Sequence, residues 1–207
     1  MTAHAFWDRT APKYARKPIA DPAAYEEKLS RVRALLRPSD RLLEIGCGTG
    51  GTALRLAPSV AQLVATDASS AMIAIAQAKL GPDAPTNVAF HQAEATDGVA
   101  GGPFDAVCAF SLLHLVDDLP GALDAIRRQV KPGGLFLSKT VCVKDANFLI
   151  RAAVPALVAI GVAPPVSALS AGALTDRIEA AGFEIEDTAY LGANRLSPFI
   201  VARRPAV

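Results

Sequence analysis

Short apolar runs alternate with amphipathic segments along most of the chain. Apolar runs of this length are typical of buried strands, and their alternation with helical segments is typical of a parallel α/β sheet. The predicted strands span residues 41–45, 60–66, 87–92, 104–110, 135–141, 183–191 and 198–203. The last two are joined by a short loop through Asn194, a spacing that favours an antiparallel hairpin.

The helices predicted between these strands have recognisable starts. Asp21 followed by Pro22 is typical of a helix N-terminus. Ser69 is expected to cap the helix after the second strand, and Asp117 or Asp118 the helix after the fourth. Further helices are expected over about residues 51–57 and 170–181. In the first helix, helical spacing places four residues on the core side: Tyr25, Leu29, Val32 and Leu36.

These elements predict one domain in four parts. They are an N-terminal arm and helix (1–38), a core (39–141), a cap insertion (142–169), and a C-terminal helix with the hairpin (170–207). A stretch that begins within the cap, Ala152 to Thr175, contains no charged residue. Because prolines and a glycine interrupt this stretch, we interpret it as a packed helical cap and not as a membrane span.

The charge and cysteine composition indicate which binding partners and which cell compartment to expect. Lys and Arg number 21 against 20 for Asp and Glu, a net charge of +1, which gives no overall field for binding a nucleic acid backbone. The basic excess within residues 9–41 is interpreted as a solvated helix face. The three cysteines are few and widely spaced, which favours reduced thiols in the cytoplasm and predicts no metal site.

A glycine-rich turn follows the first strand. Gly46, Gly48 and Gly50 allow the backbone to come close to a ligand, and the helix that follows offers free N–H groups. Gly46, Gly48 and Gly51 also satisfy the fingerprint of dinucleotide-binding proteins, and Asp67 stands where either kind of cofactor places its ribose. The glycines alone therefore leave an NAD-dependent oxidoreductase open.

Glu44, two residues before the first glycine, separates these alternatives. An acid is unfavourable beside a pyrophosphate but suits the ammonium and sulfonium charges of S-adenosylmethionine (SAM). With Glu44, Asp67, the run 104–107 and the Pro-Gly-Gly at 132–134, the chain resembles the class I SAM-dependent methyltransferases. Among them it is similar to small bacterial enzymes related to ubiquinone and menaquinone biosynthesis. The resemblance implies a Rossmann-like sheet of seven strands, mostly parallel, with helices on both faces and the last strand antiparallel.

The resemblance also implies a set of cofactor contacts. Glu44 would lie near the amino group of the methionine part, and Asp67 would accept both ribose hydroxyls. Glu94 stands where the family commonly has an aspartate that meets the adenine amino group, so this contact departs from the pattern. The implied contacts are Tyr14, Tyr25, Glu44, Gly46, Cys47, Gly48, Gly50, Asp67, Ala68, Met72, Glu94, Ala95, Ser111 and Leu112.

The acceptor side of the reaction is less defined. His114 follows the fourth strand, at the sheet edge where ligands bind, and it could act as a general base, contact the ligand or pack. Cys142 is a weaker candidate nucleophile. The apolar cap, with Phe148, favours a small apolar or amphipathic methyl acceptor, although the same surface could form a homodimer contact. A protein that binds SAM without catalysis remains the other alternative.

Overall fold

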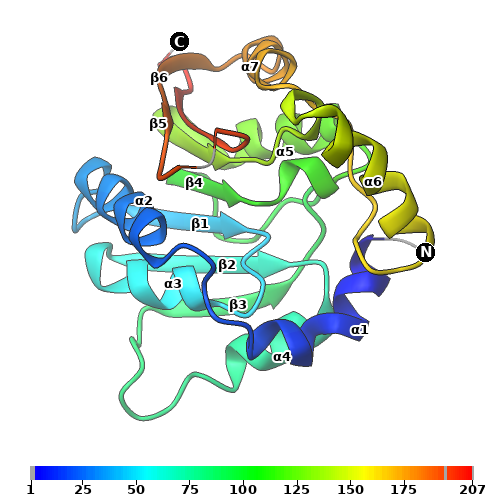
Figure 1. The fold of residues 1–207 in the computed structure, drawn as a ribbon. Coiled ribbons are helices and arrows are strands. Elements are labelled where there is room, and N and C mark those ends of the chain that lie inside the picture. Colours follow the sequence, from blue (N-terminus) through cyan, green and yellow to red (C-terminus); the bar gives the residue numbers. More distant parts are fainter. Residues whose placement is uncertain (1–2, 194, 207) are drawn as a thin grey trace.

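A computed structural model of the chain describes residues 3–193 and 195–206, and its centre is one seven-stranded sheet (Figure 1). The strand order is β3-β2-β1-β4-β5-β7-β6; β7 is antiparallel to both neighbours and the other neighbours are parallel. The predicted fold class is confirmed. Asn194, which we expect between the last two strands, lies outside the described residues. The strands are β1 (Arg41–Ile45), β2 (Gln62–Asp67), β3 (Val88–Gln92), β4 (Phe104–Phe110), β5 (Val130–Lys139), β6 (Glu184–Tyr190) and β7 (Pro198–Arg203).

Helices cover both faces of the sheet because successive strand residues point to opposite sides. In β1, Leu42 packs with α2, α3 and α4, whereas Leu43 packs with α5 and α7. Short 3-10 turns lie at Ala57–Ser59, Leu113–Leu115 and Val143–Asp145. The helices are α1 (Ala3–Ala15), α2 (Pro22–Leu35), α3 (Gly51–Leu56), α4 (Ser70–Gln77), α5 (Leu119–Gln129), α6 (Phe148–Ala159) and α7 (Ala171–Ala180).

The predicted helix caps are confirmed by their hydrogen bonds. Asp21 Oδ1 accepts the Ala24 N–H at 3.0 Å at the start of α2. Ser69 Oγ accepts the Met72 N–H at 3.1 Å at the start of α4. Of the two candidates before α5, it is Asp118 that forms the cap. These side chains satisfy N–H groups that have no partner within the helix, so they fix where each helix begins.

Two segments differ from the sequence prediction. The N-terminal arm contains a helix, α1, which packs on α4. Strand β5 begins at Val130 and not at residue 135, because the glycine-rich stretch before it continues the ladder. Gly133 N–H donates to the Arg204 carbonyl at 2.8 Å, and Arg204 N–H donates to the Gly134 carbonyl at 3.0 Å. The expected turn at 131–134 is therefore an irregular first part of the strand.

Helices α1 and α6 lie beyond the arrowheads of β1, β2 and β4 (Figure 1). This is the edge at which parallel α/β sheets bind ligands. No residue of α6 is buried, so the expectation of a packed cap is wrong for this helix. Its sequence is apolar all round and gives it no single core-facing side, and it packs mainly on the turn Val143–Asp145. No helix in the described part of the chain is long and apolar enough to cross a membrane.

Candidate cofactor site

The glycine turn between β1 and α3 has one open point. Gly46, Gly48 and Gly50 have φ of 72°, 55° and 76°, a region that L side chains rarely adopt. A Cβ on Gly46 would lie 2.8 Å from Leu112, and one on Gly50 would lie 2.7 Å from the Phe90 ring. A Cβ on Gly48 would meet nothing within 4 Å. Gly48 is thus where a ligand can approach the backbone, whereas the other two glycines allow close packing.

Asp67, at the end of β2, is held against this turn. Its Oδ2 accepts the Gly48 N–H at 2.8 Å, and its Oδ1 accepts the Ser69 N–H at 2.9 Å. Burial raises the pKa of Asp67, and the two backbone hydrogen bonds oppose this effect. Each carboxylate oxygen has a second lone pair, so both can still accept a hydroxyl side by side. The geometry suits a pair of ribose hydroxyls.

The predicted adenine contacts follow the neighbouring ends of β2 and β3, except for Met72, which lies in the first turn of α4. Gln92 Nε2 joins the two strand ends by donating to the Ala68 carbonyl at 3.0 Å. Met72 and Ala95 are buried, whereas Glu94 is exposed and has its Oε1 3.6 Å from His4 Nδ1 of α1. The longer acid thus reaches toward α1. The roles of these residues toward adenine stay a prediction.

Glu44 is a buried acid without a complete set of partners. It is 2% exposed, and its Oε2 accepts no hydrogen bond. Burial raises the pKa of Glu44 to about 7, and the nearby charge of Lys28 acts against that rise. A buried polar atom without a partner is costly, so a ligand that donates to this oxygen would remove the cost.

Lys28, on α2, is a buried cation beside Glu44 that the sequence pattern did not predict. It is 7% exposed, and its Nζ donates to Thr52 Oγ1 at 3.4 Å. The same Nζ lies 4.6 Å from the Tyr25 ring centroid and 4.4 Å from that of Phe110. Burial lowers the pKa of Lys28 to about 8, against the raising effect of Glu44. Its signal was its place three residues after Tyr25, on the apolar stripe of the helix, where a lysine is out of pattern.

The loop after β4 begins beside this buried pair, next to Phe110. Ser111 has φ of 55°, a strained conformation for a residue other than glycine, and its N–H donates to the Lys139 carbonyl at 2.6 Å. Strain of this kind gathers at functional sites, and here it directs the chain so that Leu112 covers Gly46. Lys139, half-buried at the end of β5, is a second cation near Lys28, and burial lowers its pKa.

His114 lies in the 3-10 turn beyond this loop and is 8% exposed. Its Nδ1 has no hydrogen-bond partner, and burial lowers its pKa to about 4. Its carbonyl accepts the Ser167 N–H at 2.7 Å, which ties the turn to the segment after α6. The imidazole is therefore neutral at pH 7 and able to accept a hydrogen bond. A role as general base stays a prediction.

Helix α1 brings the N-terminal arm to the site. Asp8 Oδ1 accepts the Ser69 hydroxyl at 2.6 Å and the Ala71 N–H at 3.1 Å, so α1 supplies a second cap to α4. At the other end of α1, Tyr14 stacks edge-on with Trp7 at 5.4 Å between ring centroids. Partial burial, and then the charge of Asp67, raise the pKa of Tyr14. The structure thus brings Tyr14 toward the Asp67 carboxylate.

The three cysteines are free and buried. Burial raises the pKa of each thiol, that of Cys142 to about 11, so all are protonated and weakly nucleophilic at neutral pH. Cys47 lies within the glycine turn, as the resemblance implies. Over the residues that the structure describes, no three acidic, histidine or cysteine side chains gather as a metal site.

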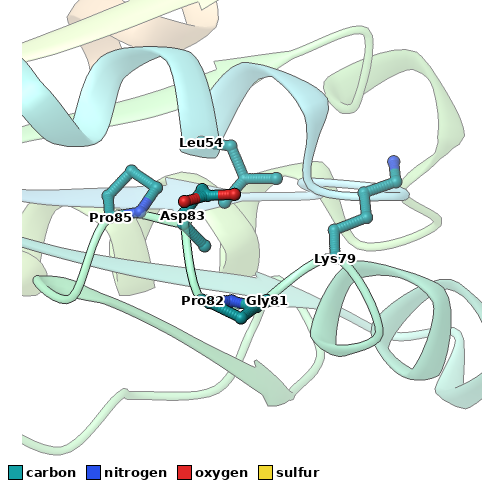
Figure 2. Close-up of a pocket in the computed structure, with 7 residues that line it drawn as sticks. Leu54, Lys79, Gly81, Pro82, Asp83 and Pro85 are labelled. Carbon is teal, nitrogen blue, oxygen red and sulfur yellow. The ribbon is translucent and has the colours of Figure 1, made fainter.

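A hollow of about 360 Å³ lies elsewhere, along the loop between α4 and β3 (Figure 2). Its wall includes Leu54, Asp83 and Lys79, and Lys79 Nζ donates to the Thr49 carbonyl at 2.6 Å. Lys79 thus connects the hollow to the glycine turn, but neither Glu44 nor Asp67 lines the hollow. We assign the cofactor site to the strand ends and not to this hollow.

Comparison with known proteins places this arrangement in a family. The model of a methyltransferase domain family matches residues 15–188, which include the glycine turn, Glu44 and Asp67. The chain belongs to this methyltransferase family. The match confirms the resemblance to class I SAM-dependent methyltransferases and the cofactor SAM, and it disfavours an NAD-dependent oxidoreductase.

Individual relatives show how far the likeness extends. Magnesium-protoporphyrin O-methyltransferase of Rhodobacter capsulatus is 36% identical over 127 residues, 52% of this chain and 54% of that protein. Demethylmenaquinone methyltransferase of Clavibacter sepedonicus is 38% identical over 97 residues, 46% of this chain and 38% of that protein. The matches thus span about half or less of these relatives. Magnesium protoporphyrin IX methyltransferase of Synechocystis, solved with bound SAH, shares the fold at a TM-score of 0.74, with 16% identity and 97% of each chain covered.

Proposed function

We propose that the protein transfers the methyl group of SAM to a small apolar or amphipathic molecule. The observation that carries this proposal is the buried pair of Glu44, with its unpartnered oxygen, and Lys28. An amino acid carries an ammonium and a carboxylate on one carbon, and a buried acid beside a buried cation complements both. NAD has no such group, so this pair favours the methionine part of SAM.

The chain's own residues would hold the cofactor at three points. Glu44 would accept hydrogen bonds from the amino group, Lys28 would face the carboxylate, and Asp67, which holds Gly48 N–H, would accept the ribose hydroxyls. When bound, SAM supplies a methyl group that is electrophilic because it is attached to a sulfonium. The protein contributes alignment and exclusion of water, and Tyr14 and Tyr25 are proposed to close over the methionine end.

The acceptor would enter between the loop after β4 and the cap. His114 is proposed to contact it through its neutral imidazole, whose unpartnered Nδ1 can accept a hydrogen bond. With a pKa of about 4 this imidazole is a weak base, so it would help only an acceptor whose proton is readily lost. Replacing His114 by Gln tests the role. If His114 accepts the proton of the methyl acceptor, the replacement should lower the rate of methyl transfer about a hundredfold.

The relatives suggest the acceptor's chemical class. One is named for a magnesium protoporphyrin and one for a demethylmenaquinone, both apolar or amphipathic small molecules. We propose an acceptor of this kind, selected by residues 142–169 and the arm, with residues 39–141 holding the cofactor. A cytoplasmic location, supported by the three unpaired cysteines, is a further part of the proposal. A homodimer contact through residues 142–169 is the alternative use of the cap surface.

Turnover with labelled SAM tests the function. We expect label in one or more members of a panel of quinols, phenols and porphyrin carboxylic acids, and far less label with Asp67→Asn at the same SAM concentration. Binding of S-adenosylhomocysteine (SAH) without transfer to any member would favour a non-catalytic SAM-binding protein. Oxidation of a panel member with NAD would contradict the proposal.

A further inference from the structure

Large apolar side chains are exposed almost entirely in two segments of the described chain. Eight of the nine such side chains lie at residues 14–19 and 148–162, and Leu80 is the ninth. On α6, Phe148 is 77% exposed and Leu149 is 74% exposed, and Ile160, just beyond it, is 71% exposed. Apolar side chains scattered singly over a surface are ordinary, but a contiguous group marks an interaction site.

The two segments are joined at one point, and together we call them the α1–α6 face: residues 9–19 and 144–162. Arg9 of α1 donates from Nη2 to the Gly161 carbonyl, just beyond α6, at 3.0 Å. Both helices lie at the same end of the molecule, beyond the carboxyl ends of the central strands (Figure 1). Both helices therefore lie on the side of the sheet at which the candidate cofactor site is expected to open.

The same face is basic. Its only acid is Asp145, whose Oδ2 accepts the Ala171 N–H at 2.7 Å, and the acid of α1 just before the face, Asp8, caps α4. Both carboxylates are thus already engaged in holding the fold. Against them stand six exposed basic side chains: Arg9, Lys13, Arg16, Lys17, Lys144 and Arg151.

We propose that the α1–α6 face binds the surface of an anionic lipid bilayer. Exposed apolar side chains beside lysines and arginines match a membrane interface, where the apolar groups enter the acyl boundary and the cations meet lipid phosphates. A second copy of this chain fits less well, because a symmetric contact would bring two basic faces together. This binding goes beyond the proposed function, since it requires no methyl transfer, and it would place the site opening where an apolar acceptor dissolves.

Vesicle sedimentation tests the proposal with the whole chain and no methyl donor. We expect binding to vesicles of phosphatidylglycerol mixed equally with phosphatidylcholine, weak binding to phosphatidylcholine alone, and loss of most binding at about 1 M salt. Each neutralised cation should lower the partition coefficient about fivefold, so Lys13→Gln with Arg16→Gln should lower it by roughly 25-fold. Phe148→Ser with Ile160→Ser should lower it by about tenfold or more, since both side chains would lie in the acyl boundary.

Leu80→Ser is the matched control, because Leu80 is 40% exposed but lies outside the face. It should sediment like the wild type, and all variants should keep the wild-type unfolding midpoint. Absence of binding to the anionic vesicles would overturn the proposal. So would equal loss in Leu80→Ser, or a dimer in ultracentrifugation that Phe148→Ser dissociates while vesicle binding is absent. SAH titration is independent of these readouts, so failure of the proposed function would be seen separately.

Discussion

The buried charges of Lys28 and Glu44 make cofactor affinity depend on pH. Glu44 can hold an ammonium group only when ionised, and its pKa is raised by burial to about 7. Lys28 can hold a carboxylate only when protonated, and burial lowers its pKa to about 8. Affinity for SAH should therefore fall on the acid side through loss of Glu44 charge and on the alkaline side through loss of Lys28 charge.

The size of the effect follows from the two pKa values. At about pH 7.5 roughly three quarters of each group carries its charge, so more than half of the protein has both charges. At about pH 6 or pH 9 one of the two groups is only about a tenth charged. SAH should then bind about sixfold more weakly than at the optimum.

Isothermal titration of SAH across this range measures the profile. Glu44→Gln should remove the loss of affinity on the acid side of the profile, and Lys28→Met should remove the loss on the alkaline side. Glu184→Gln is the matched control, because Glu184 is exposed on the edge strand β6. This variant should keep the loss of affinity on both sides of the profile. A flat profile in the wild type, or a loss on the acid side that survives in Glu44→Gln, would refute the reasoning.

The remaining predictions concern stability. Leu42→Ala removes a fully buried side chain and should lower the free energy of unfolding by about 2–5 kcal/mol in urea titration; a change below about 1 kcal/mol would contradict the burial. Gly50→Ala should cost more than Gly48→Ala, by roughly 1 kcal/mol or more, because both strain φ but only the first drives a Cβ into the Phe90 ring; equal melting shifts would count against this. Burial raises the Glu44 pKa from 4.5 to about 7, so the folded protein holds that proton more tightly and stability falls as pH rises through this window, by on the order of 3 kcal/mol. Glu44→Gln should flatten this fall in thermal unfolding, and an unchanged slope would show that another group causes it.

Local chemistry explains what the sequence could predict. The glycine turn and Asp67 could be predicted because positive φ and a carboxylate at a strand end each need particular residue types at particular positions. The caps at Asp21 and Ser69 could also be predicted, because each side chain accepts the N–H of the residue three positions later. The mostly parallel α/β sheet could be predicted because the alternation of helices and strands is visible in the sequence, whereas the order of the strands comes from the structure.

Long-range contacts explain what the sequence could not predict. Asp8 caps a helix more than sixty residues away, so α1 becomes fixed only by a contact that no local pattern contains. Lys28 acquires its role from Glu44 and Phe110, which lie on two different strands. The apolar composition of α6 is visible in the sequence, but whether another part of the chain covers it is not. Burial, and the pKa shifts that follow from it, depend on the assembled fold.

The central claim, a SAM site built on Glu44 and Asp67, is tested most directly by isothermal titration of SAH and, separately, of NAD. We predict that the wild type binds SAH at micromolar concentrations and does not bind NAD. Asp67→Asn should weaken SAH binding by about a hundredfold, because one amide cannot accept two hydroxyls as the carboxylate does, while the unfolding midpoint shows that the fold persists. Binding of NAD in place of SAH, or undiminished SAH binding in Asp67→Asn, would contradict the account.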